Sequence, residues 1–300
     1  METETGRKEL FEDKFNYLLF GVLGTLLIIT LYFVGGIFLE GFLSYIFPGL
    51  QAGLQSSIIQ ILLMLVPAVI AIGITPAGFG RLLNIGLGVN LKISAIAILG
   101  YLPLIIFYTS YSYLQDVYIA PYFEPYYTNI KDFITDAYSN IFRYSGPYGI
   151  IPAVFVAAIV PAISEELLFR GYFQGCLLQK LKPRNAILIA SVVFAITHLN
   201  PISLLPLLMI GLYLGLSAYL TKNIIVPIVI HFINNFISVL VFYSPELESI
   251  DKAPEQIPLI YLILSMALSA AIIAIAIKYM ITIRSGKKQK EGAGSDQPLM

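Results

Sequence analysis

The chain has 300 residues, of which 58% are hydrophobic and 12% are charged, and its mean hydropathy is +0.82. A composition this apolar excludes an ordinary soluble domain. The 18 Lys and Arg residues balance the 18 Asp and Glu residues, and this zero net charge argues against a nucleic-acid partner.

Long apolar runs predict where the chain crosses a membrane, because a bilayer core requires about 20 apolar residues per helix. They indicate an all-α polytopic membrane protein with about eight transmembrane helices in a single transmembrane domain, 15–283. A cytosolic N-terminal segment, 1–14, precedes this domain, and a disordered cytosolic tail, 284–300, follows it. The predicted helices cover residues 15–38, 54–75, 93–113, 148–181, 184–199, 202–220, 223–243 and 257–280.

Lys and Arg residues are distributed unevenly between the two sides of this predicted membrane domain. Of the 18, three (Lys131, Arg143 and Lys252) fall on one side, Arg170 falls within a helix, and the other 14 fall on the side of both termini. Cytosolic connections carry the excess of positive charge in membrane proteins, so both termini are expected in the cytosol. The tyrosine-rich outer connection, 114–147, is expected to lie along the membrane interface.

Ionisable residues are concentrated in one part of the predicted membrane domain. The stretch "PAISEELLFRGYFQ" places Glu165 and Glu166 within a predicted helix, and both histidines of the chain, His198 and His231, also fall within predicted helices. Such groups cost at least about 2.5–3.5 kcal/mol each near the bilayer centre, and they usually mark a functional site. We therefore expect a polar site within the membrane, built from three neighbouring helices.

Helical geometry indicates which of these side chains can meet. Glu166 and Arg170 are four residues apart, so they lie on one face of the helix and can neutralise each other. Successive residues differ in direction by about 100°, so Glu165 points away from that pair and is available for chemistry.

The predicted depths of Glu165 and His198 are consistent with a single site, whereas His231 lies only about eight residues from the turn "TKN", so that turn must sit deeper or its helix must be displaced. A charged turn, "KLKPRN", joins the helices that carry Glu165 and His198. At 1.5 Å per residue, both side chains lie about 23–26 Å from this turn and are nearly level if the helices are antiparallel. Phe194 shares a helix face with His198, and Asn235 shares one with His231.

Three short motifs in this part of the chain carry a resemblance to a known family. "EELLFR" (165–170), "FAITH" (194–198) and "HFINN" (231–235) match EExxxR, FxxxH and HxxxN/D in that order. The motif-bearing core, about 148–243, thus resembles the CAAX protease and bacteriocin-processing (Abi) family of intramembrane glutamate proteases. Asn234 adjoins Asn235, but only Asn235 has the motif spacing.

The resemblance implies peptide-bond hydrolysis without a covalent intermediate, a metal or another cofactor. In this family the first glutamate and the first histidine, here Glu165 and His198, activate a water molecule. His231 and Asn235 would bind the oxyanion of the tetrahedral intermediate. Losing one such donor typically lowers the rate by ~10²–10³.

The remaining motif residues are expected to support this site. Glu166 and Arg170 would form an ion pair that keeps the helix neutral in lipid, and Phe194 would pack beneath His198. The resemblance further implies that the enzyme removes the last three residues of prenylated CAAX-type proteins or processes small peptides. Its expected partners are therefore the lipid bilayer and a prenylated or membrane-associated peptide.

Two alternatives remain open at the level of sequence. A cluster of Glu and His residues also suits zinc, so a zinc-dependent intramembrane protease is one alternative, although the chain lacks an HExxH motif. A non-catalytic transporter or immunity-type membrane protein that uses the cluster as a binding site is the other. Chelator sensitivity would distinguish the first, and function retained after Glu165→Ala would favour the second.

Overall fold

The structure is a computed structural model that describes residues 15–83, 90–144, 148–244 and 257–293. These residues form helices joined by turns, with no strand among them, which confirms the predicted all-α class. The predicted N-terminal segment, 1–14, lies outside the described residues. Of the predicted tail, the last helix includes residues up to Ala293, and 294–300 lie outside the described residues. The domain boundaries stay a prediction.

Within the described residues, seven helical stretches are long and apolar enough to cross a membrane, which indicates an integral membrane protein. They are Tyr17–Ile46, Ala52–Ile74, Leu91–Tyr122, Ile150–Leu178, Leu204–Thr221, Ile225–Tyr243 and Leu259–Ser285. The remaining predicted helix is α13 (Pro183–Thr197), which has 15 residues. At 1.5 Å per residue it is about 22 Å long, shorter than the ~30 Å core of a bilayer.

Several of these stretches are built from more than one helical segment, because π-helical turns interrupt them. The first three stretches consist of α2 (Tyr17–Thr30), η1 (Leu31–Gly35), α3 (Gly36–Ile46), α4 (Ala52–Gln60), η2 (Ile61–Leu65), α5 (Val66–Ile74), α7 (Leu91–Leu99), α8 (Leu102–Leu114), η3 (Gln115–Ile119) and η4 (Ala120–Tyr122). The others consist of α10 (Ile150–Val154), η5 (Phe155–Ile159), α11 (Val160–Glu166), η6 (Leu167–Phe173), α12 (Gln174–Leu178), α14 (Leu204–Thr221), α15 (Ile225–Tyr243) and α17 (Leu259–Ala293). The short α6 (Gly78–Leu83) and the longer α9 (Tyr126–Phe142) connect stretches. All but η4 of the η segments are π-helical, a form that often occurs at functional sites.

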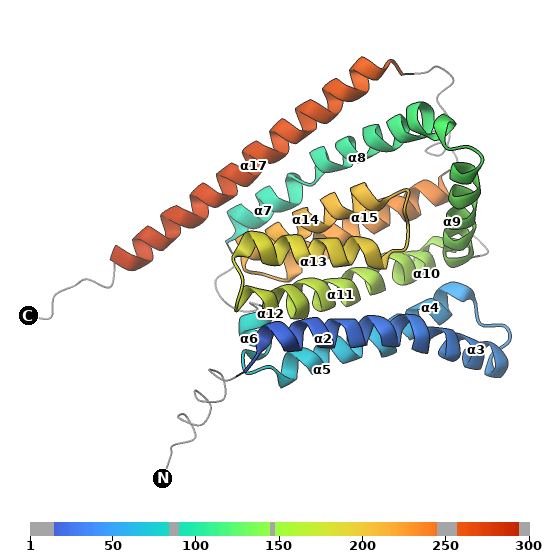
Figure 1. The fold of residues 1–300 in the computed structure, drawn as a ribbon, viewed down its shortest axis with the longest axis horizontal. Helices are drawn as coiled ribbons and strands as arrows, with labels where there is room; N and C mark the ends of the chain where they lie inside the picture. The colour runs from blue at the N-terminus through green and yellow to red at the C-terminus, as the bar shows by residue number, and fades with distance from the viewer. Residues whose placement is uncertain (1–14, 84–89, 145–147, 245–256, 294–300) are drawn as a thin grey trace, which may run out of the picture.

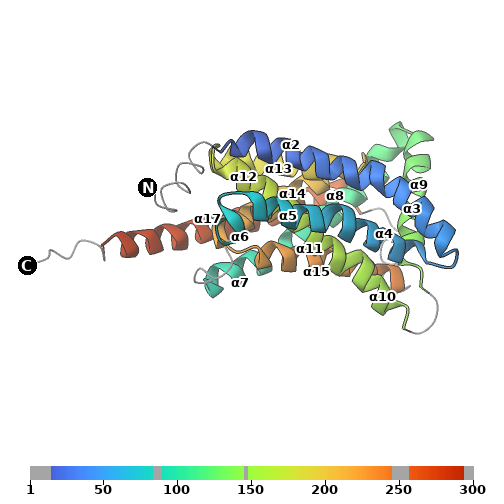
Figure 2. The same cartoon turned by 90° about the horizontal axis from the view of Figure 1, so that it is seen from below.

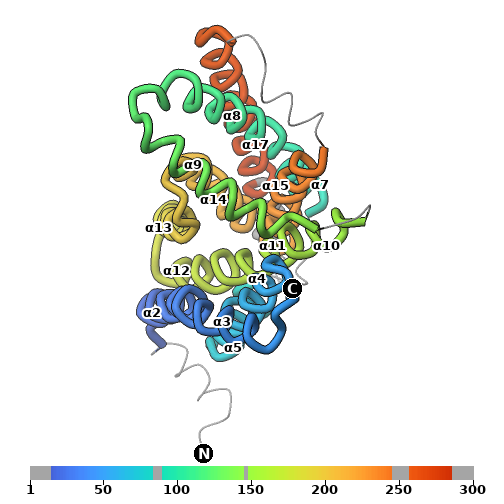
Figure 3. Tube along the Cα trace, turned by 90° about the vertical axis from the view of Figure 1, so that its right-hand side faces the viewer, coloured from blue at the N-terminus to red at the C-terminus, as the bar shows by residue number. Residues whose placement is uncertain are grey.

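The helices run roughly alongside one another, and the stretch from α10 to α12 lies near the middle (Figure 1). On one side it packs against α2 and the α4–α5 stretch, and on the other against α13 and α15 (Figures 2 and 3). The exception is α9, which crosses one end of the bundle (Figure 1). The expectation that the outer connection follows the membrane interface stays a prediction.

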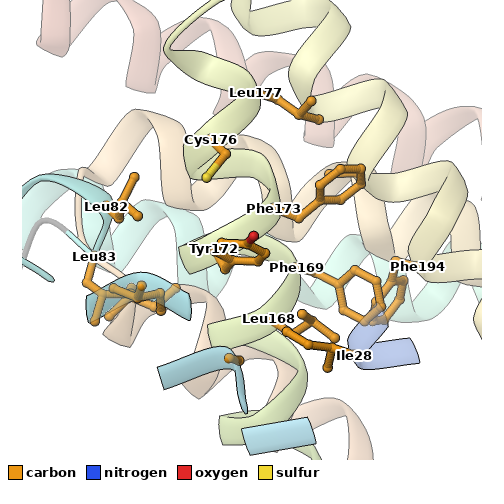
Figure 4. Packing of buried hydrophobic residues seen from close by; sticks show 14 of the residues in the cluster. Ile28, Leu82, Leu83, Leu168, Phe169, Tyr172, Phe173, Cys176, Leu177 and Phe194 are labelled. Atoms are coloured by element: carbon orange, nitrogen blue, oxygen red, sulfur yellow. The ribbon is translucent and has the colours of Figure 1, made fainter. Parts of the chain in front are cut away.

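Close packing of α14 brings three helices together next to the motif-bearing residues. A Cβ atom added at Gly211 would lie 3.2 Å from Phe194 on α13, and one added at Gly215 would lie 2.6 Å from Gln174 on α12. The rings of Phe169 and Phe194 meet edge to face at 5.3 Å in the same core (Figure 4). Because Gly211 and Gly215 have no side chain, α14 can approach α12 and α13 this closely.

The opposite end of the bundle from α9 carries a cavity with a basic lining. Its volume is about 170 Å³, and Arg81, Lys222 and Arg284 line it together with Gln179. These residues come from α6, α17 and the ends of α12 and α14. Segments that the sequence analysis places on the side of both termini thus meet at one end.

Candidate active site

The two glutamates lie near the middle of the central membrane stretch. Glu166 is the last residue of α11, and the π-helical η6 follows directly. Glu165 is about 20 Å from either end of the stretch Ile150–Leu178 at 1.5 Å per residue. The site is therefore at the depth where unpaired charges are most costly.

Glu166 and Arg170 form the expected pair. The Arg170 Nη1 atom donates to Glu166 Oε1 at 2.8 Å, and both side chains are almost completely buried. The other terminal nitrogen of Arg170 donates to the backbone oxygen of Gly211 at 3.1 Å, and the guanidinium lies over the ring of Phe194. A buried charge pair needs such additional partners to offset its desolvation.

Glu166 also binds His231, a contact that the sequence analysis did not anticipate. His231 Nδ1 lies 2.8 Å from Glu166 Oε1. Because an ionised carboxylate only accepts hydrogen bonds, the proton of this bond belongs to Nδ1. Nε2 of the same ring points to the other glutamate, 3.9 Å from Glu165 Oε2. Glu166 therefore orients His231 as well as neutralising Arg170.

His198 is held by the end of α13. Its Nδ1 lies 2.8 Å from the backbone oxygen of Phe194, which can only accept, so Nδ1 carries the proton. Its Nε2 lies 3.7 Å from Glu165 Oε2. The next residue, Leu199, has φ of 50°, a left-handed conformation that costs a non-glycine residue roughly 1–2 kcal/mol. This backbone turn ends the helix and leaves His198 on its last turn.

The two carboxylate oxygens of Glu165 have different surroundings. Oε1 accepts a hydrogen bond of 3.1 Å from Gln60 Nε2. Oε2 is buried, has no hydrogen-bond partner among the described residues, and faces the Nε2 atoms of His198 and His231. Three polar atoms from three helices thus converge on one point.

Asn235 lies one turn beyond His231 on α15, within a chain of hydrogen bonds. The Tyr101 hydroxyl donates to Asn234 Oδ1 at 2.5 Å, and Asn234 Nδ2 donates to Asn235 Oδ1 at 2.9 Å. In this arrangement the Asn235 oxygen is occupied, whereas its Nδ2 has no hydrogen-bond partner among the described residues. Asn235 can therefore act as a donor on the side of the helix that carries His231.

Two residues that act on Glu165 were not predicted from the sequence. Gln60 was visible as a polar residue within a predicted apolar helix, 54–75, but nothing in the sequence linked it to Glu165. Tyr138 lies on α9 and is 44% exposed, and its pKa is raised from 10.0 by partial burial and further by the negative charge of Glu165. The helix that crosses the end of the bundle is therefore within electrostatic reach of the site.

Among the residues that the structure describes, no group of three or more His, Cys, Asp or Glu side chains is arranged to hold a metal ion. Chelator sensitivity of cleavage is the test of the zinc-dependent alternative.

Comparisons with known proteins bear on the same segment. Residues 147–237 match the family model described as Type II CAAX prenyl endopeptidase Rce1-like. This segment contains the three motifs and all seven residues that the sequence analysis singled out. The resemblance of this part of the chain to the CAAX protease family is thus confirmed.

Two curated proteins are similar to the chain over about a third of its length. The membrane-embedded CAAX protease MroQ of Staphylococcus aureus (strain USA300) is 30% identical over 116 residues, which cover 36% of this chain and 46% of that protein. The putative membrane peptidase YdiL of Bacillus subtilis (strain 168) is 33% identical over 107 residues, which cover 36% of this chain and 44% of that protein. The chain thus spans less than half the length of these relatives. No solved structure matches the chain.

Proposed function

We propose that this chain is an intramembrane endopeptidase in which Glu165 and His198 activate a water molecule to hydrolyse a peptide bond. The observation that carries the proposal is the convergence of Glu165 Oε2 and the two histidine Nε2 atoms, at 3.7 and 3.9 Å. The similarity of residues 147–237 to type II CAAX prenyl endopeptidases supports the same activity.

The geometry is suited to an attacking water. A separation of 3.7 Å is too long for a direct hydrogen bond, and a water molecule admitted between the two atoms when substrate binds would bond to both. Because Nδ1 of His198 carries the ring proton, its Nε2 presents a lone pair. The water can therefore donate one hydrogen to Glu165 Oε2 and the other to His198 Nε2, and direct its own lone pair to the substrate carbonyl.

Hydrolysis then follows without a covalent enzyme intermediate. As the water oxygen bonds to the carbonyl carbon, one proton moves to the Glu165–His198 pair. The same pair returns the proton to the amide nitrogen when the carbon–nitrogen bond breaks. The products are a carboxylic acid and an amine, and the site is restored.

Asn235 and His231 would stabilise the oxyanion formed in this step. Nδ2 of Asn235 is a free donor among the described residues, one helical turn from His231. His231 can donate from Nε2 when the ring also carries a proton there, and its bond to Glu166 holds the ring in the required orientation. Such preorganised donors usually supply a large part of the rate enhancement.

For the substrate, we propose a prenylated CAAX-type protein that loses its last three residues, or a small membrane-associated peptide. Support comes from the family similarity and from the position of the site within apolar helices, which a lipid-modified peptide can reach through the bilayer. One of the two relatives is itself named as a CAAX protease.

For the orientation in the membrane, we propose that both termini face the cytosol. The distribution of Lys and Arg residues supports this, and Arg81, Lys222 and Arg284 gather around one cavity on that side. On the other side, Lys131 pairs with Asp116 at 2.9 Å, and Lys252 lies outside the described residues.

The experiment that tests the function uses the purified full chain in detergent with a quenched-fluorescent prenylated CAAX peptide, with and without a strong chelator. We expect chelator-resistant cleavage, with a product lighter by the last three residues, and weaker cleavage of the same peptide without the prenyl group. Cleavage abolished by the chelator and restored by zinc would replace the proposal with the metal-dependent alternative. No cleavage of prenylated or unprenylated peptides would favour a binding or transport role.

A further inference from the structure

We infer that Gln60, on a helix outside the segment that matches the family model, is a positioning residue for Glu165. The inference rests on the proposed function, because it concerns the residue proposed to activate water. Gln60 is the last residue of α4, in the N-terminal part of the chain, whereas the family match begins at residue 147. The functional site would thus extend beyond the three motifs.

The contact is specific and buried. Gln60 is 5% exposed, and its Nε2 donates to Glu165 Oε1 at 3.1 Å. An amide in an apolar environment is costly unless its polar atoms are bonded, so the position of this side chain depends on the carboxylate. The two residues come from helices that pack against each other, α4 and α11.

This bond gives the two carboxylate oxygens of Glu165 different roles. Oε1 is held by Gln60, which leaves Oε2 facing the two histidine Nε2 atoms. The terminal torsion of a glutamate is broad and roughly two-fold. Without the amide donor, the carboxylate can rotate and move its oxygens away from the point where the imidazoles converge.

A purely structural role for Gln60, as a polar link between two membrane helices, makes different predictions. Loss of such a link would lower thermal stability without a particular effect on the catalytic step. Loss of a positioning contact would lower kcat with little change in KM. It would also change the pH profile, because a hydrogen bond to a carboxylate favours the form that accepts it.

The same helix provides a matched control. Gln55 is also buried, at 9% exposure, and its side chain bonds to Ser44 and to the backbone oxygen of Leu50. Neither partner belongs to the candidate site. Gln55→Met therefore removes a buried amide from α4 without touching Glu165.

The test is to measure kcat, KM, the pH profile and the melting temperature of the wild-type chain, Gln60→Met and Gln55→Met. For Gln60→Met we expect kcat to fall by about 10- to 100-fold with KM within about two-fold, from the loss of one hydrogen bond to a charged group. We also expect the acidic limb of its profile to move to higher pH. Gln55→Met should keep the wild-type kcat and profile. Equal effects of both variants, or a wild-type kcat in Gln60→Met, would overturn the inference.

A second variant tests the donor directly. In Gln60→Glu, a protonated carboxyl at position 60 can donate to Glu165, whereas an ionised one repels it. We therefore expect Gln60→Glu to exceed Gln60→Met in activity at low pH and to lose this advantage as the pH rises. The profile is read together with the two histidines, whose Nε2 atoms lie 3.7 and 3.9 Å from Glu165 Oε2, and with Arg170, Tyr32 and Tyr138, which interact with its charge through space. The same relative activity of the two variants at every pH would contradict a donor role.

Infrared spectroscopy separates this inference from the proposed function. The carboxyl bands of Glu165 are measured in the wild type, in Gln60→Met and in Gln55→Met. In each case the spectrum of the same chain carrying Glu165→Gln is subtracted. A band that shifts in Gln60→Met but not in Gln55→Met supports the contact even if no peptide is cleaved, in which case only the proposed function fails. An unchanged band overturns the inference whatever the activity.

Discussion

The buried ion pair of Glu166 and Arg170 leads to a prediction about the free energy of unfolding. Removing one partner should destabilise the protein more than removing both, which loss of ordinary packing would not do. In Glu166→Leu, the Arg170 guanidinium stays buried without its carboxylate, and in Arg170→Met the carboxylate loses its cation. Removing one partner of a buried pair costs about 3–5 kcal/mol. Each single variant should therefore lower the free energy of unfolding by about that amount.

The double variant, Glu166→Leu with Arg170→Met, should behave differently. Replacement of a whole buried ion pair by apolar residues of similar volume is often neutral or stabilising, by about 1–4 kcal/mol. We therefore expect the double variant to lose far less than the sum of the two losses, with a remaining loss of about 1–3 kcal/mol because the buried His231 Nδ1 has lost its acceptor. The coupling energy of such a cycle measures the interaction between the two side chains.

Stability and activity should separate in this double variant. The double variant lacks the carboxylate that accepts from His231 Nδ1, so His231 is no longer held toward the reacting carbonyl. We expect kcat to be lower by roughly 10²–10³, as for the loss of an oxyanion donor, although the double variant is more stable than either single variant. Reversible unfolding in mixed micelles gives the stability, and the fluorescent peptide gives kcat. Additive destabilisation, or a stable double variant with full activity, would refute this account of Glu166.

Two further substitutions test other parts of the site, one control accompanies them, and a cysteine substitution tests the orientation in the membrane. Asn235→Ala should lower kcat by about 10²–10³ with little change in KM, and an unchanged kcat would exclude an oxyanion role. Tyr101→Phe should lower kcat by a smaller factor, roughly 3- to 10-fold, because a bond that orients the Asn235 amide is lost. The control Tyr213→Phe, which removes a buried hydroxyl bonded to the backbone oxygen of Ala97, should leave kcat unchanged, and equal losses would point to packing alone. A cysteine placed at Lys222 should react with membrane-impermeant reagents only from the cytosolic side, and labelling from outside would reverse the proposed orientation.

Hydropathy and helical spacing were sufficient to predict those features that depend on residues close together in the sequence. Apolar run length gives most of the membrane helices, and the four-residue spacing of Glu166 and Arg170 gives their ion pair. Composition alone also predicted that 184–199 crosses the membrane like the other helices, whereas α13 has only 15 residues. In the structure α13 ends at Thr197, because Leu199 adopts a left-handed conformation just before Asn200 and Pro201.

Contacts between distant segments could not be predicted in this way. The bond from Gln60 to Glu165 joins residues 105 positions apart, and that from His231 to Glu166 joins residues 65 apart. Both depend on how far each helix is rotated about its axis. That rotation is set by packing and by π-helical turns such as η5, which precedes both glutamates and changes the direction of every later side chain.

The most direct test of the central proposal is the turnover of the prenylated peptide by Glu165→Ala beside Glu40→Ala. Glu40 is an exposed carboxylate on α3, another membrane helix, and it belongs to no contact of the site. We expect Glu165→Ala to abolish cleavage while its melting temperature stays close to that of the wild type, and Glu40→Ala to cleave normally. Cleavage by a folded Glu165→Ala at the wild-type rate would contradict the role of Glu165 in activating water.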